Sequence, residues 1–265
     1  MTTAKTFTYS HTIGFLAATG RGFTNPVDLA INSQGTLYVL NRAGPETSVR
    51  LPSKRVSMAT LDEEWLGEWG TGGRNDGEFW WPSSIAIDSQ DNVYVADEAL
   101  QRISIFDKYG KFLNKWGVKG FLDGQLNHPS CIRFDAEENL WLTDSGNHKV
   151  QKFTKDGQFI SAWGERGSES GQFEGPWGLA LTGAGDIYIS DWGNNRIQRY
   201  NMWKMGQAHW GKAKRAAVAG KYDIAEKHYM QAKRRYLQAL VRIEESKKKR
   251  VYNEFKSLIQ LDVLL

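Results

Sequence analysis

One spacing recurs along this chain and limits the folds that it can adopt. Trp-Gly pairs recur at a constant interval of 47 residues, and three prolines keep the same interval. The pairs begin at Trp69, Trp116, Trp163 and Trp210, and the prolines are Pro82, Pro129 and Pro176, preceded by Pro26 at an interval of 56. A fixed period of this length is the sequence signature of a repeat architecture. The fold is therefore expected to be an array of similar units.

Each unit contains four short runs that are rich in β-branched and aromatic residues. In the second unit these runs cover 85–88, 92–97, 102–106 and 112–116, with turn-forming residues between them. Apolar side chains alternate with a period of two, as in half-buried strands. Four antiparallel strands in a unit of about 40–50 residues form a β-propeller blade. We expect the first strands of the later blades to begin near Ser84, Ser130 and Trp177.

The second to fourth units resemble NHL repeats. The resemblance rests on residues 82–97, 144–153 and 191–200, and it extends over about 7–205. It implies a propeller, and NHL propellers usually have six blades. We predict an all-β propeller of about four NHL-type, four-stranded blades. Residues 12–20 are expected to form an outer strand whose partners lie at the other end of the chain. Either this strand closes a ring of four blades, or the ring is incomplete and is covered or dimerised.

The composition changes beyond Trp210, where Ala, Lys, Arg and Glu dominate. Residues 216–232 resemble one tetratricopeptide (TPR) helix pair, with small residues where two helices approach each other. We therefore expect two domains, a propeller over 1–207 and a helical tail over 208–265. One TPR unit is too small to form a peptide-binding groove. The sequence favours a capping or dimerising helical hairpin, so a homo-oligomer through the tail is one expected assembly.

Charge also separates the two parts. Residues 1–207 carry 20 Lys and Arg against 24 Asp and Glu, whereas residues 208–265 carry 14 against 6. A basic helix can bind nucleic acid, an anionic membrane or an acidic protein, or it can be a solvated face. The acidic balance of the propeller disfavours nucleic acid as its ligand.

The cysteine content and the chain's ends bear on the compartment. Cys131 is the one cysteine, so an internal disulfide is excluded and a reducing cytoplasm is expected. No stretch has the length and apolar character of a signal peptide or a transmembrane span.

The propeller repeats contain few histidines that could serve as metal ligands. His128 and His148 lie in the third repeat, and some NHL-like lyases hold a catalytic zinc with histidines from several blades. Here Trp81 and Gly175 occupy the positions equivalent to His128, and a zinc site needs about three converging ligands. We therefore expect no catalytic residue, no metal and no cofactor.

An acid and a base recur five residues apart in three repeats. The pairs are Asp97 and Arg102, Asp144 and Lys149, and Asp191 and Arg196, with Asn41 at the acid's position in the first repeat. Repetition favours a structural brace, in which the carboxylate caps turn amides and pairs with the base. The alternative is a ring of carboxylates that binds calcium, as in lactonase-type propellers.

The sequence favours a non-enzymatic scaffold that binds an unidentified protein partner. Its support is the loop chemistry, because exposed tryptophan and arginine dominate interface energetics. The candidate binding residues are Trp80, Trp81, Trp177, Trp192 and Arg42, the last at the start of an insertion over 42–55. The alternative is a propeller enzyme of the lactonase or lyase type with a channel metal.

Overall fold

The computed structural model describes residues 10–14, 16–17, 19–42, 53–182 and 186–201, together with 227, 231 and 232. The chain divides into two compact units, Met1–Glu165 and Arg166–Leu265, and each is described by itself. The expected domain boundary between 207 and 208 and nearly all of the expected helical tail lie outside the described residues. Within the tail, Lys227, Gln231 and Ala232 are helical. No helix among these described parts is both long and apolar enough to cross a membrane.

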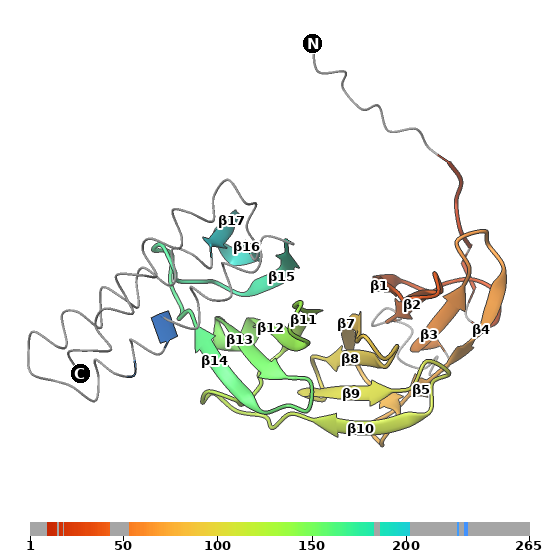
Figure 1. The fold of residues 1–265 in the computed structure, drawn as a ribbon, viewed down its shortest axis with the longest axis horizontal. Helices are drawn as coiled ribbons and strands as arrows, with labels where there is room; N and C mark the ends of the chain where they lie inside the picture. The colour runs from red at the N-terminus through yellow and green to blue at the C-terminus, as the bar shows by residue number, and fades with distance from the viewer. Residues whose placement is uncertain are drawn as a thin grey trace, which may run out of the picture. The chain divides into compact units, whose positions relative to one another are not determined.

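Met1–Glu165 contains three four-stranded antiparallel sheets, which are three blades (Figure 1). The first blade consists of β1 (Pro26–Ile31), β2 (Leu37–Asn41), β3 (Arg55–Ala59) and β4 (Trp65–Trp69). The second consists of β7 (Pro82–Ile87), β8 (Val93–Asp97), β9 (Arg102–Phe106) and β10 (Phe112–Trp116). The third consists of β11 (Pro129–Phe134), β12 (Asn139–Asp144), β13 (Lys149–Thr154) and β14 (Phe159–Trp163). A parallel pair, β5 (Thr71–Gly72) with β6 (Glu78–Phe79), precedes the second blade, and the 3-10 turn η3 (Ser145–Asn147) joins β12 to β13.

Arg166–Leu265 contains the fourth blade. Its described strands are β15 (Pro176–Leu181), β16 (Asp186–Asp191) and β17 (Arg196–Asn201), with the 3-10 turn η4 (Trp192–Asn194) between the last two. The fourth outer strand expected near 205–210 lies outside the described residues. The predicted all-β propeller with four blades is confirmed.

A proline begins the first strand of every blade. The first strands of the later blades begin at Pro82, Pro129 and Pro176, within two residues of the predicted positions. Each register shifts directly after its proline, as it does after Pro26 in β1. Proline has no N–H to donate to a ladder, so a strand tolerates it at the first position and beside a bulge.

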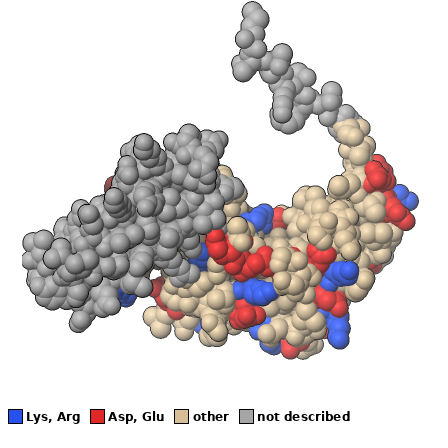
Figure 2. All heavy atoms as spheres, viewed as in Figure 1, with Lys and Arg blue, Asp and Glu red and all other residues tan. Residues whose placement is uncertain are grey.

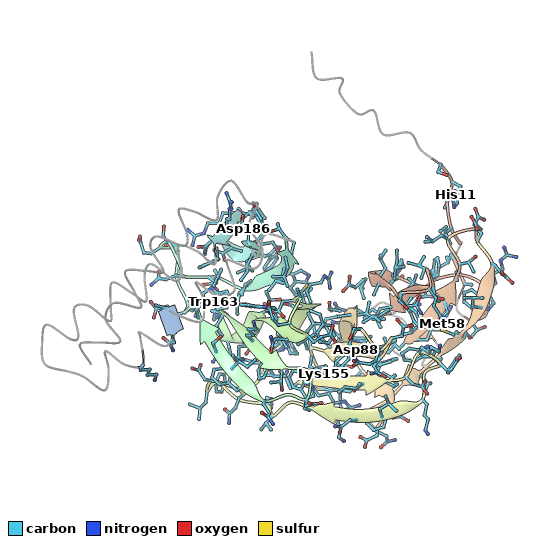
Figure 3. The ribbon with its side chains drawn as sticks, viewed as in Figure 1. His11, Met58, Asp88, Lys155, Trp163 and Asp186 are labelled. Carbon is cyan, nitrogen blue, oxygen red and sulfur yellow. The ribbon has the colours of Figure 1, made fainter. Side chains whose placement is uncertain are left out.

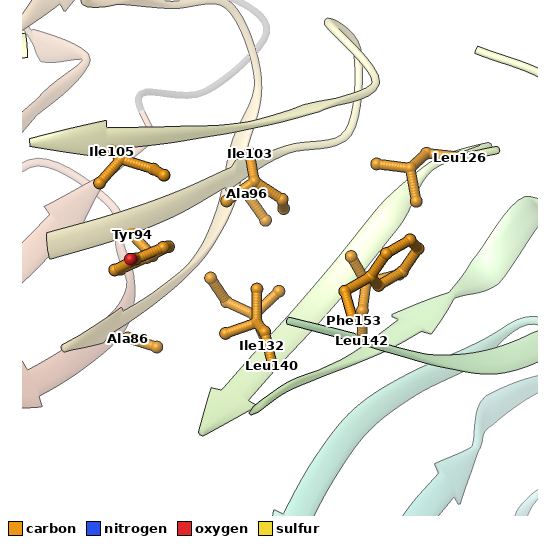
Figure 4. Packing of buried hydrophobic residues seen from close by; sticks show 10 residues of the cluster. All are labelled: Ala86, Tyr94, Ala96, Ile103, Ile105, Leu126, Ile132, Leu140, Leu142 and Phe153. Carbon is orange, nitrogen blue, oxygen red and sulfur yellow. The ribbon is translucent and has the colours of Figure 1, made fainter. Parts of the chain in front are cut away.

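Apolar side chains between consecutive blades form the core of Met1–Glu165. Here the side of a blade that packs on the next blade is called its forward face, and the opposite side its back face. Tyr94, Ala96 and Ile103 on the forward face of the second blade meet Ile132 and Leu142 on the back face of the third (Figure 4). Tyr38, Leu40 and Val56 of the first blade meet Ile85 and Val95 of the second in the same way. Neighbouring blades thus bury apolar faces that one sheet alone leaves wet.

Polar contacts join the same blades at one end. Ser33 Oγ in the β1–β2 turn donates to Asp91 at 3.1 Å, and Ser89 Oγ at the equivalent position of the second blade donates to Glu138 at 3.0 Å. Lys155 Nζ of the third blade lies 4.0 Å from Asp88 Oδ2 of the second (Figure 3). These contacts fix the blade-to-blade register at the end opposite the β2–β3 loops.

The amino-terminal segment differs from the expected outer strand. Among its described residues, the one ladder contact is a parallel bridge from Leu16 to Phe23. Lys119 with Leu126 and Arg166 with Phe173 form the same bridge in later repeats. Leu16 is therefore equivalent to a residue beyond an outer strand, in the connection that enters the next blade. The prediction of an outer strand over 12–20 was wrong for the described residues of that range, because they belong to the connection that enters the first blade.

Candidate functional site

The end of each blade's second strand faces the start of its third strand. In cross-strand register Asp97 lies opposite Arg102, Asp144 opposite Lys149, and Asp191 opposite Arg196. In the first blade Asn41 lies opposite Arg55. Arg55 was missed as the fourth base because the insertion after Asn41 displaces it from the five-residue spacing. Cross-strand position, rather than sequence spacing, identifies it.

The acid of each hairpin accepts hydrogen bonds from the backbone just before its blade's first strand. Asp97 accepts from the N–H of Trp80 at 2.7 Å, Asp144 from Asn127 at 2.7 Å, and Asp191 from Glu174 at 2.8 Å. In the first blade Asn41 Oδ1 accepts from Thr24 N at 2.7 Å. Each side chain therefore satisfies a backbone donor at the point where the chain enters the blade.

The bases bond mainly to carbonyl groups of that same entering connection. Arg102 Nη2 donates to Asn75 O at 2.6 Å and to Glu78 O at 3.0 Å. Arg196 Nη2 donates to the equivalent carbonyls of Glu169 and Gln172 at 2.7 and 2.9 Å. Lys149 Nζ donates to Phe121 O at 3.2 Å, and Arg55 Nη2 to Gly22 O at 3.2 Å. The base therefore holds the entering connection by its carbonyl groups, and the acid holds the backbone N–H at the end of that connection.

The predicted pairing of acid with base holds in one repeat. Arg196 Nε lies 2.8 Å from Asp191 Oδ2. Lys149 turns instead to Asp123 at 3.1 Å, and Arg102 lies 3.9 Å from Asp76. Among the described residues, no ion pair joins Arg102 to Asp97 or Lys149 to Asp144, and both bases bond to carbonyls of the entering connection instead.

The two buried acids Asp144 and Asp191 differ in their ionisation. Burial raises the pKa of Asp144 to about 6, although Asn127, Asn147 and Gln151 donate hydrogen bonds to its carboxylate. Burial also acts on Asp191, but the hydrogen bonds it accepts, including one from the Arg196 guanidinium, outweigh it and hold its pKa below the ordinary value. Of these two acids, only Asp191 has the guanidinium of a described residue within hydrogen-bond distance, Arg196 Nε at 2.8 Å.

Cations of the first blade and its outgoing connection cover Trp80 and Trp81. The Arg42 guanidinium lies 4.2 Å from the Trp81 ring centroid. Lys54 Nζ lies 4.6 Å from the Trp80 ring and donates to Trp80 O at 2.7 Å. The Arg74 guanidinium lies 4.8 Å from the Trp80 ring. We call these five residues, with Glu98, the tryptophan–cation cluster.

The charges in this cluster are partly withdrawn from water. Lys54 is 1% exposed, and burial lowers its pKa. Arg42 Nη2 lies 2.9 Å from Glu98 Oε1, whereas Glu98 Oε2 is buried with no hydrogen-bond partner among the described residues. Burial raises the pKa of Glu98, and the nearby Arg42 opposes this shift. The cluster therefore joins the first two blades at a cost in desolvation.

The predicted loop tryptophans have different exposures. Trp80 and Trp81 are half-buried under their cations, whereas the prediction treated them as exposed. In Arg166–Leu265, Trp192 is 75% exposed and Trp177 is 43% exposed. Trp192 directly follows Asp191, and Asp191 lies opposite Pro176 in the register, so both rings belong to one end of the fourth blade. Sequence alone did not show that Arg42 and Lys54 reach the second blade.

The inner strands carry a polar contact that sequence reasoning missed. Asp28 of β1 accepts from Arg133 of β11 at 3.0 and 3.1 Å and from Ser84 Oγ of β7 at 2.5 Å. Asp28 and Ser84 follow Pro26 and Pro82 at the same distance, and this shared repeat position is the signal that identifies them. The Asp28 carboxylate is thus occupied by neighbours from two other blades.

The described residues offer no cluster of metal ligands. No three His, Cys, Asp or Glu side chains in them form a group that could hold a metal ion. His128 is exposed, and its Nδ1 lies 2.8 Å from Asn127 Oδ1. His148 ends η3 in the left-handed conformation. Both histidines therefore lie in turns.

Comparison with known proteins identifies the repeat. The NHL repeat model matches residues 79–106, 126–153 and 173–200, one match in each of the last three blades. The chain therefore contains NHL repeats. No curated protein matches the sequence.

Matching solved structures include two lyases and one protein of unknown function. Virginiamycin B lyase from Staphylococcus aureus is 16% identical, with a TM-score of 0.47, and the match covers 66% of this chain and 55% of the lyase. A streptogramin B lyase is 12% identical, with a TM-score of 0.47 and coverage of 65% and 53%. A protein of unknown function from Bacteroides thetaiotaomicron is 18% identical, with a TM-score of 0.48 and coverage of 64% and 43%. This chain thus spans little more than half the length of either lyase.

Proposed function

We propose that this NHL propeller is a non-enzymatic scaffold that binds a protein partner at the Trp177 and Trp192 end of the fourth blade. The observation that carries the proposal is the exposure of Trp192, which is 75%. A tryptophan ring left in water gains more free energy from burial in an interface than most side chains do. Arg42, Trp80 and Trp81 have a structural role in this proposal, because they already contact one another.

The surface charges also favour a protein partner. On the face of Met1–Glu165 shown in Figure 2, acidic and basic side chains are interspersed rather than gathered in a basic stripe. A nucleic-acid ligand calls for clustered Lys and Arg. The basic tail over 208–265 adds a second docking or self-association segment in this proposal, and the single, buried Cys131 favours the cytoplasm.

The experiment compares binding by tryptophan variants of the full chain. Trp192→Ala and Trp177→Ala should each reduce capture of the partner in a quantitative pull-down, and the double variant should abolish it. Phe121→Ala is the matched control, because Phe121 is an aromatic residue with 77% exposure elsewhere on the chain. Equal losses in the control and in Trp192→Ala would contradict the proposal.

The enzyme alternative has its own test. The acids that recur in each hairpin accept N–H donors, and Asp28 accepts from Ser84 and Arg133. Oxygens engaged in this way are poor candidates for metal ligands, so these contacts support the scaffold. Elemental analysis of the purified chain should therefore find no stoichiometric metal. A bound metal at one per chain would favour the propeller enzyme instead.

A further inference from the structure

The back face of the first blade exposes apolar side chains to solvent along β1. Leu29 is 57% exposed, Ile31 is 50% exposed and Val27 is 38% exposed. Alternate residues of a regular strand point to the same face, so Leu29 and Ile31 lie on one side of the sheet, and Val27 lies beside them in the irregularity after Pro26. Large apolar groups side by side on an exposed sheet face mark an interaction surface more often than isolated ones do.

The equivalent residues of the next two blades are buried. Ile85 and Ile132 occupy the position of Leu29, and they are 1% and 0% exposed. Ile85 packs against Tyr38, Leu40 and Val56 of the first blade, and Ile132 packs against the second blade. Twice in this chain, therefore, this position is covered by the forward face of another blade.

The chemistry of the exposed face matches those interfaces. Leu29, like Ile85 and Ile132, is a large aliphatic residue, and the register places it opposite Val39 of β2. The pairs equivalent to Leu29 and Val39 are Ile85 with Val95, and Ile132 with Leu142. The second and third blades bury both members of the pair, whereas the first blade buries Val39, at 5% exposure, and leaves Leu29 exposed.

We propose that the back face of β1 at Leu29 and Ile31, together with the adjacent exposed Val27, binds a second copy of this chain. The surfaces that cover its equivalents are blades of the same repeat, and a second copy supplies such a blade. The three side chains carry no charge, so neither an acidic nor a basic ligand gains a specific contact from them. The association uses the propeller and is separate from self-association through the basic tail.

The first test is sedimentation of the full chain over about 1–100 µM, because self-association follows mass action. The wild-type mass should rise with concentration. Leu29→Glu should raise the dissociation constant by about tenfold or more, since it places a charge in an apolar contact. Leu113→Glu is the matched control, because Leu113 is a 47% exposed leucine on β10. It should leave the association unchanged.

Three results would overturn the proposal. A wild-type chain that stays monomeric over the whole range would do so. Association that survives Leu29→Glu but is lost in Leu240→Glu of the full chain would place the contact in the tail. A monomeric wild type in which Leu29→Glu lowers stability, at every concentration alike, would show that the face is covered within the chain.

A second measurement uses a variant that introduces no charge, so its result does not depend on whether the fold accepts a glutamate at position 29. Leu29→Cys adds an accessible thiol, whereas the native Cys131 is 6% exposed. The rate of reaction with a maleimide should fall as the protein concentration rises, because the second copy covers position 29. A rate that stays constant with concentration would contradict a covering copy.

Discussion

Trp80 and Trp81 lie beneath cationic side chains, whereas Trp192 presents its ring to solvent. Arg42 and Lys54 come from the first blade and cover a pair at the entrance to the second. Trp192, with 75% exposure, stands at the corresponding end of the fourth blade. Tryptophan therefore has two roles at one end of this repeat. The covered rings of Trp80 and Trp81 hold two blades together. The exposed ring of Trp192 can still gain free energy by being buried against a partner.

The largest decrease in stability is expected when a covered tryptophan ring is removed. Trp81→Ala removes the ring over which Arg42 lies at 4.2 Å and leaves the Arg42–Glu98 pair without its packing surface. The free energy of unfolding of Met1–Glu165 should fall by about 2–3 kcal/mol, less than for a fully buried aromatic side chain. Urea denaturation measures this change. A loss as small as that of Trp192→Ala would remove the distinction between the two regions.

The hairpin acids should have similar effects in both regions. Asp97→Ala leaves the N–H groups of Trp80 and Trp81 without their acceptor, and Asp191→Ala does the same to Glu174. Each should cost about 1–3 kcal/mol, as should Asp144→Ala, because a buried donor is left unsatisfied. Asp123→Ala is the control, since its side chain is 64% exposed, and it should cost less than about 0.5 kcal/mol. Hydrogen exchange at the freed amides locates the loss, and equal losses in Asp123→Ala would contradict the brace.

The two regions should respond to pH with opposite signs. Burial raises the pKa of Glu98 above its ordinary value of 4.5, so the cluster's stability is full below pH 4.5 and falls as the pH rises through the raised pKa. Despite burial, hydrogen bonds lower the pKa of Asp191 from 3.8, so its contribution is full above pH 3.8 and is lost as the pH falls through the lowered pKa. Denaturation at a series of pH values tests both. Glu98→Gln should remove the part of the first dependence that comes from Glu98. The part that comes from Asp144, whose pKa is raised to about 6, should remain, as should the second dependence.

The smallest effect is expected at the exposed ring. Trp192→Ala should change the free energy of unfolding by less than about 0.5 kcal/mol, because few of its contacts with the protein are lost. Calorimetry of this variant beside Trp81→Ala gives the comparison directly. A destabilisation above about 1 kcal/mol would mean that the Trp192 ring supports the fold, and the proposed binding role would lose its main observation.

Sequence reasoning located the blades better than their side-chain partners. The 47-residue interval predicts strands at Pro82, Pro129 and Pro176 because repetition constrains the backbone directly. The partners of Arg102 and Lys149 depend on where the entering connection folds back, and no local pattern carries that information. Arg55 escaped notice because an insertion changed its spacing while its cross-strand position stayed the same.

The cations that cover Trp80 and Trp81 could not be predicted from the sequence for a related reason. Arg42 and Lys54 lie near the two ends of the insertion of the first repeat, 39 and 26 residues before the nearest tryptophan that each contacts. Their approach follows from the packing of one blade on the next. The exposure of Trp192 agrees with its predicted place in the loop that follows Asp191.

The hairpin bases set an order in which a growing chain can complete its blades. Arg102, Lys149 and Arg196 bond to carbonyls that lie 24 to 28 residues earlier in the sequence. During synthesis each entering connection therefore emerges well before the residue that holds it in place. Until the third strand of a blade has been synthesised, its entering connection lacks the base that holds it, although the first two strands can already pair. Translation slowed before a third strand would therefore leave that blade's entering connection unsecured, whereas slowing at any later point in the blade would not.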